Sequence, residues 1–214
     1  MRKYLIISLL ASYSIVFAGE SEDFKAVDNL YKERNFKTAL TESEKFLQKY
    51  PESKHQKSMR DKVAKIYFLE KNYKKAEELF KKLFTMEEKQ SQKEEYASYL
   101  ARANALLNNS NSAMFYLREI KDEKTFQKTF FAVAQDFLAK ENNEAAKKAY
   151  TEIINNKYEN YKESMMGLGI VYYNLKDYDK AIYWLSEFSK AMPNENKEMV
   201  SYLRASAIYR KGST

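Results

Sequence analysis

Alanine recurs at one position of a pattern that repeats five times along this chain. The alanines are 33 to 37 residues apart, and each follows an Asn or Asp by four residues: Ala39, Ala76, Ala113, Ala146 and Ala181. Self-similarity at this period is typical of supersecondary units that bury their apolar faces only against neighbouring units. We therefore expect a stacked array that presents a long surface, rather than a closed globule.

Each repeat reads as two helices joined by a short turn. Helix formers dominate, with only four Gly and two Pro in 214 residues. In the clearest copy, apolar residues recur at spacings of three and four from Met165 to Tyr172, and again from Tyr178 to Phe188, before Pro193. Such spacing places them on one helix face. The break between the two stripes predicts a turn.

Small residues form two columns in the repeat. One is the alanine column, and the other lies in the first helices: Val27, Ala64, Ala101, Ala134, Gly169 and Ala205. Small side chains let helix backbones approach closely, so we expect both columns to be buried. The residues four before each alanine suit N-caps, because their side chains accept hydrogen bonds from free N–H groups: Asn35, Asn72, Asn109, Asn142 and Asp177.

These columns, with the aromatic residues Phe36, Tyr73 and Tyr178 and the closing prolines Pro51 and Pro193, resemble the tetratricopeptide repeat (TPR) family. The resemblance implies an all-α fold, an α-solenoid of stacked antiparallel helix pairs forming a superhelix. It covers essentially all of residues 19–214. The units lie at about 20–53, 57–90, 94–126, 127–160 and 162–195, with a partial unit at 198–214.

The third and fourth units depart most from the family pattern. Asn104, Ser110 and Asn143 stand at positions where an aromatic residue is usual. We therefore expect these two units to be the least regular.

The N-terminus has the parts of a signal peptide. Arg2 and Lys3 precede an uncharged apolar stretch from Leu5 to Phe17, and Ala18 precedes Gly19 at the expected cleavage site. The stretch is shorter than the roughly 20 residues of a membrane-spanning helix. We therefore expect residues 1–18 to be removed and the protein to be exported, periplasmic or extracellular, without spanning a membrane. Because the chain has no Cys, neither a lipid-bearing cysteine nor a disulfide is available.

The positive charge is concentrated in one segment. The formal charge of +7 includes Arg2 and Lys3. The segment from Lys57 to Lys93 contains eleven Lys or Arg residues and six Asp or Glu residues. This pattern is typical of a solvated helix face. The alternative is that the basic second unit docks an anionic envelope polymer or a membrane surface. A nucleic-acid partner is not expected for an exported protein.

No residue pattern indicates catalysis, a metal site or a cofactor. Nucleophilic catalysis needs a nucleophile beside a base. The one histidine, His55, lies in a polar joint and is interpreted as a solvated loop residue. One His and no Cys cannot supply a metal cluster of these residues. We therefore expect a protein that is not an enzyme and needs no cofactor.

The TPR resemblance implies that the first helices line a concave groove. Their residues in one register are mostly aromatic and apolar, which suits a polypeptide ligand. The candidate partner-binding residues are Phe24, Tyr31, Lys65, Phe68, Arg102, Phe131, Met166, Ile170 and Tyr173. The alternative is that several of them belong to the core.

Together these features predict an exported TPR scaffold that binds protein or peptide partners in the bacterial cell envelope. The first two units, with Phe46 and the run from Tyr50 to Ser53, resemble periplasmic TPR proteins of outer-membrane assembly and the Tol-Pal machinery. Residues 199–210 are apolar on nearly every side, whereas a terminal cap should be polar. We expect either self-association or a missing continuation of the array there, and favour the continuation.

Overall fold

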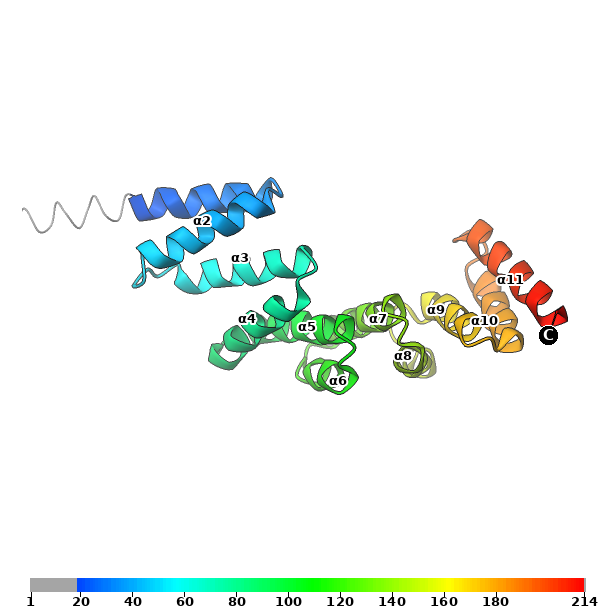
Figure 1. Cartoon of the computed structure of the whole chain (residues 1–214). Helices are drawn as coiled ribbons and strands as arrows, with labels where there is room; N and C mark the ends of the chain where they lie inside the picture. Colours follow the sequence, from blue (N-terminus) through cyan, green and yellow to red (C-terminus); the bar gives the residue numbers. More distant parts are fainter. Residues whose placement is uncertain (1–18, 214) are drawn as a thin grey trace, which may run out of the picture. The chain divides into compact units, whose positions relative to one another are not determined.

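A computed structural model of the protein describes residues 19–213, and the expected signal peptide at residues 1–18 lies outside them. Helices follow one another through this described part, and no strand occurs between residues 19 and 213 (Figure 1). None of the described helices combines the length and apolar character needed to cross a membrane.

The first compact unit ends at Glu87. Its helices are residues 19–32, α2 (Phe36–Lys49), α3 (Gln56–Leu69) and α4 (Tyr73–Met86). Val27 of the first helix packs with Phe46 of α2 and Met59 of α3, while α3 packs against α4. The unit therefore has a core of its own.

The second compact unit begins at Glu88. It holds α5 (Gln90–Leu106), α6 (Ser110–Arg118), α7 (Glu123–Ala139), α8 (Asn143–Asn156), α9 (Tyr161–Asn174), α10 (Tyr178–Ala191) and α11 (Lys197–Gly212). Each helix packs against the next, and α5 also contacts α7 (Figure 1). The expected all-α fold of stacked helix pairs is confirmed.

The alanine column is fully buried in both units, since the five alanines are 0% exposed. In the first-helix column, Val27, Ala64, Ala101, Ala134 and Gly169 are buried as well. Ala205 of α11 is exposed, contrary to the expectation. The reason is that residues 19–213 contain no second helix after α11 that could cover it.

Two glycines of α9 sit where no larger side chain fits. A Cβ added at Gly169 would lie 2.7 Å from Cγ of Leu185 and 3.2 Å from its backbone nitrogen. A Cβ added at Gly167 would lie 2.4 Å from Cζ of Tyr150. The backbone of α9 therefore closely approaches α10 on one side and the ring of Tyr150, from α8, on the other. Gly167 lies outside both small columns and the sequence pattern did not reveal it.

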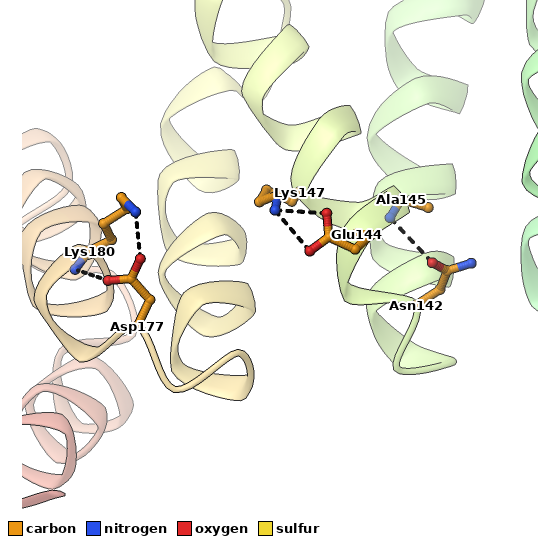
Figure 2. A network of polar contacts seen from close by, with 6 residues as sticks. All are labelled: Asn142, Glu144, Ala145, Lys147, Asp177 and Lys180. Atoms are coloured by element: carbon orange, nitrogen blue, oxygen red, sulfur yellow. Dashed lines mark hydrogen bonds and ion pairs between the residues drawn. The ribbon is translucent and has the colours of Figure 1, made fainter. Parts of the chain in front are cut away.

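The turn within each helix pair contains a non-glycine residue with positive φ: Arg34 (60°), Lys71 (61°), Asn108 (62°), Glu141 (58°) and Lys176 (62°). Each directly precedes the Asn/Asp column. Three of those caps, Asn72, Asn142 and Asp177, accept a hydrogen bond from the N–H three residues on, and Figure 2 shows the last two. Asn35 and Asn109 make no such side-chain bond.

We expect Glu141→Gly to raise the free energy of unfolding by about 0.5–1 kcal/mol. A side chain in the left-handed region costs about 1–2 kcal/mol, and glycine removes that cost at the expense of unfolded-state entropy. The matched control is Glu152→Gly on the exposed side of α8, which should lower stability by about 1 kcal/mol. Denaturant titrations measure both, and two shifts of the same sign would contradict the assignment.

The third repeat, at about residues 94–126, is irregular in its second helix. α6 has nine residues, whereas α8 has fourteen. Glu94 of α5 is buried, and its carboxylate accepts hydrogen bonds from the backbone N–H groups of Lys121 and Asp122 at 3.1 and 3.3 Å. This contact fixes the connection that leads from α6 into α7. Asn104, which replaces an aromatic residue, is buried and donates to the carbonyl of Leu100.

Candidate functional site

The first helices of the second unit are linked by polar contacts. α5 packs on α7, and weaker contacts join α7 with α9 and α9 with α11. Three hydrogen-bonded pairs connect residues about one repeat apart: Ser98 with Thr129 at 2.9 Å, Arg102 with Asp136 at 2.8 Å, and Tyr173 with Ser206 at 2.7 Å. These contacts align the row of first helices from which a binding surface can be built.

Arg102 and Asp136 form a two-bond ion pair between α5 and α7. Nε of Arg102 donates to Oδ2 of Asp136 at 2.8 Å, and Nη2 donates to Oδ1 at 3.2 Å. Asp136 is buried, and its burial raises the pKa of the carboxyl, outweighing the opposite effect of the guanidinium. Burial also raises the pKa of Tyr150, and the charge of Asp136 adds to this. The pair therefore holds Arg102 in a fixed orientation.

The raised pKa of Asp136 gives stability a defined pH dependence. The folded protein holds the proton more tightly than the unfolded chain, so the protonated carboxyl contributes stability below its ordinary pKa of 3.8. That contribution is lost as the pH rises through the raised pKa. We expect the free energy of unfolding of the wild type, minus that of Asp136→Asn, to fall as the pH rises from below 3.8 through the raised pKa of the folded state. A difference that grows with pH would show that the attraction of Arg102 dominates.

A surface depression of about 660 Å³ lies along α5 and α7. Its lining residues are Ser91, Glu94, Glu95, Ser98, Tyr99, Arg102, Asp122, Thr125, Lys128, Thr129 and Ala132. The hydroxyl groups can donate and accept hydrogen bonds, and both signs of charge are present. The volume falls within the range of about 300–1,000 Å³ that is usual for ligand sites. The depression can therefore hold a polar, extended ligand.

Five of the sequence-predicted residues lie in the second unit. Arg102 lines the depression. Phe131 of α7 is half-buried, with its ring centroid 6.4 Å from that of Tyr150. Met166, Ile170 and Tyr173 are half-buried on α9 at spacings of four and three, which places them on one helix face. These side chains keep part of their surface accessible, and their role in binding stays a prediction.

The aromatic candidates of the first helix lie at the edge of the core. Phe24 is half-buried against Phe46, and its ring stacks on His55 with centroids 4.1 Å apart. His55 is thus half-buried and stacked, rather than solvated as the sequence suggested. Nζ of Lys62 lies 5.5 Å from the ring centre of Phe24 and 5.8 Å from that of Tyr31. Both rings are therefore engaged within the unit.

The two candidate residues on α3 also make contacts within the first compact unit. Lys65 pairs with Asp61 at 2.8 Å. Phe68 is only 8% exposed and packs edge-on against Tyr73. Little of the Phe68 ring remains accessible, so the second unit offers the more open part of the predicted surface.

Sequence reasoning missed Asp136 and Thr129. Asp136 lies one repeat downstream of the predicted residue Arg102, and Thr129 lies one repeat downstream of Ser98. The signal that could have found Asp136 is an acidic residue one repeat period after a basic one. Residues 19–213 contain no group of three or more His, Cys, Asp or Glu side chains that could hold a metal ion.

Two segments of the chain match family profiles. Residues 131–195 and residues 62–90 each match a profile described as tetratricopeptide repeat. No curated protein matches the sequence.

Several solved structures are similar to this one. A tetratricopeptide repeat protein from Parabacteroides merdae has a TM-score of 0.63 and 13% identity, over 90% of this chain and 73% of its own. YrrB, described as a TPR protein with an unusual peptide-binding site, has a TM-score of 0.54 and 16% identity, over 87% and 88%. PilW, described as a widely conserved type IV pilus biogenesis factor, has a TM-score of 0.56 and 12% identity, over 89% of each chain. At these identities the likeness concerns the fold.

Proposed function

Because this chain belongs to the tetratricopeptide repeat family, we propose that it binds an extended polypeptide along the first helices of its second unit. The family fold is generally a scaffold for protein binding rather than a catalyst. The observation that carries the proposal is the depression along α5 and α7, which combines hydroxyl groups with both signs of charge. YrrB, whose fold is similar, is described as having a peptide-binding site.

The chemistry of this surface suits an extended backbone. The N–H and C=O groups of a bound peptide need partners when they leave water, and Ser98, Tyr99 and Thr125 supply hydroxyl groups. Phe131 and Ile170, on the neighbouring first helices α7 and α9, offer half-buried apolar surface for the peptide's side chains. The partner therefore contributes polar backbone at α5 and α7 and apolar side chains towards α9.

The proposal includes export to the bacterial cell envelope. It rests on the charged, apolar and small-residue parts of residues 1–18. PilW, a protein of similar fold, is described as a pilus biogenesis factor. Mass measurement of the protein recovered outside the cytoplasm tests this point, and a chain beginning at Gly19 is the expected result. Recovery of the uncleaved chain in the cytoplasm would contradict export.

The binding test starts with affinity capture from an envelope extract, followed by titration with the captured polypeptide. We expect the double variant Phe131→Ala and Ile170→Ala to bind about 30-fold more weakly or worse while it stays helical, because aromatic and apolar anchors dominate such interfaces. Phe115→Ala on α6 is the matched control, because this exposed ring belongs to a second helix. Unchanged affinity in the double variant would overturn the proposed surface.

Salt dependence separates this proposal from docking of an anionic polymer. Binding through the basic segment from Lys57 to Lys93 would weaken steeply with ionic strength, whereas binding at the proposed surface should change little. The structure gives the basic alternative less support, because Glu77 and Glu78 lie beside Lys81 and Lys82 in one surface depression on α4.

A further inference from the structure

α11 is covered on one side only. Val200 and Ala207 are buried, and Val200 packs with Leu185 and Phe188 of α10. The opposite side carries the exposed residues Glu198, Ser201, Tyr202, Ala205, Ile208, Tyr209 and Gly212, which we call the α11 outer face. Tyr202, Ile208 and Tyr209 are 72%, 56% and 77% exposed. Contiguous exposed apolar surface of this kind marks an interaction site.

The outer face has the pattern that other first helices use to receive a helix. Ala205 occupies the small-residue column, in which Gly169 of α9 closely contacts Leu185 of α10. At Ala205 the same small side chain is exposed, with larger apolar residues on both sides of it. The occupant that fits is therefore another helix lying close to the α11 backbone.

We propose that this occupant is α11 of a second copy, paired antiparallel about a two-fold axis at Ala205. With successive residues 100° apart around the helix, Ser201 and Ile208 flank Ala205 on one side, and Tyr202 and Tyr209 flank it on the other. An antiparallel pair then sets Ser201 opposite the second copy's Ile208, and Tyr202 opposite its Tyr209. The face is complementary to itself, as a two-fold interface requires.

Charge also favours this orientation. Glu198 is the one charged residue of the outer face and lies in the first turn of α11, whereas Arg210 and Lys211 lie in the last turn. Lys197 also lies in the first turn, so the orientation is favoured by the helix dipoles, which an antiparallel pair aligns favourably, and by the approach of Glu198 to the basic last turn of the second copy. Lys211 also pairs with Asp179 of α10, within the same chain. A parallel pair would instead bring the two basic last turns together.

The available area is sufficient for a weak dimer. Large aromatic side chains bury about 150–250 Å² each, and Tyr202 and Tyr209 are mostly exposed. With Ile208 and the smaller residues of the outer face, the surface available for pairing is on the order of 500 Å² per copy. The two copies together reach about 1,000 Å², the lower end of specific interfaces. We therefore expect dissociation constants in the micromolar range.

Sedimentation equilibrium of residues 19–214 is the first test. We expect a concentration-dependent dimer, and an increase in its dissociation constant of about 30-fold or more in the double variant Tyr202→Glu and Tyr209→Glu. Phe115→Glu is the matched control, because this ring of α6 is 54% exposed and lies outside the outer face. Circular dichroism shows whether each variant keeps its helices. A protein that stays monomeric at all concentrations up to about 100 µM, or a dimer whose dissociation constant is unchanged in the double variant, would overturn the proposal.

Cysteine cross-linking tests the orientation, because the protein has no cysteine of its own. A disulfide needs Cα atoms about 4.4–6.8 Å apart. We expect Ala205→Cys to form a homodimeric disulfide under mild oxidation, and Tyr202→Cys to cross-link with Tyr209→Cys but not with itself. Ser112→Cys on the exposed side of α6 should not cross-link. Preferred linkage between two Tyr202→Cys chains, or equal linkage at Ser112→Cys, would rule out the two-fold pairing.

Discussion

Gly169→Val is expected to lower the free energy of unfolding by about 3 kcal/mol or more. The added Cβ alone would lie 2.7 Å from Cγ and 3.2 Å from the backbone nitrogen of Leu185, so α9 and α10 would have to separate. Overpacking a close helix contact costs about 1–3 kcal/mol per substitution, and valine adds a branched side chain that α-helices accommodate poorly. Thermal and denaturant unfolding measure the loss.

Alanine substitutions provide the controls for this prediction. Gly169→Ala should give a smaller loss than valine, although Ala in a helix is ordinarily favoured over Gly by about 1 kcal/mol. Gly212→Ala should cause no loss, because nothing lies within 4 Å of the Cβ position there. Equal stability changes at Gly169 and Gly212 would contradict the close approach of α9 to α10.

Phe80→Ala is expected to lower the stability of the first unit by about 3–5 kcal/mol, the usual cost of truncating a buried phenylalanine. Phe80 is fully buried on α4. Because the second unit has its own buried phenylalanines, including Phe130 and Phe137, its helices should keep their protection against amide hydrogen exchange. The exposed Phe115 provides the control, since Phe115→Ala should leave exchange unchanged. Equal loss of protection from α5 to α11 would show that the two units unfold together.

The repeat was readable from the sequence because burial imposes the same requirement in every unit. A close contact between helix backbones accepts only a small side chain, so the five alanines recur and are all fully buried. The turn positions were readable for a similar reason, since Asn and Asp cap helices. The structure adds that Asn72, Asn142 and Asp177 make the side-chain bond and Asn109 does not.

The surface was less predictable, because exposure depends on which neighbouring side chain covers a residue. Phe68 and Tyr173 have equivalent positions in the repeat, but Phe68 is buried and Tyr173 is half-buried. The division at Glu87 had no Pro or Gly signal, because a short charged connection lies there. The requirement for a glycine at position 167 was not predictable from the repeat either, because it comes from contact with one bulky side chain, that of Tyr150.

The pairs that join successive first helices have a consequence for how this chain can change by duplication and deletion. Arg102 and Asp136 belong to different repeats, as do Ser98 and Thr129. Excising the third or the fourth repeat would remove one member of each of these pairs and leave the other member without its hydrogen-bond partner. A duplication would repeat a donor without its acceptor. The segment that can be exchanged as a whole is therefore the pair of neighbouring first helices with the contacts between them. Recombination with breakpoints that keep such a pair together should be tolerated better than recombination with breakpoints at the repeat boundaries.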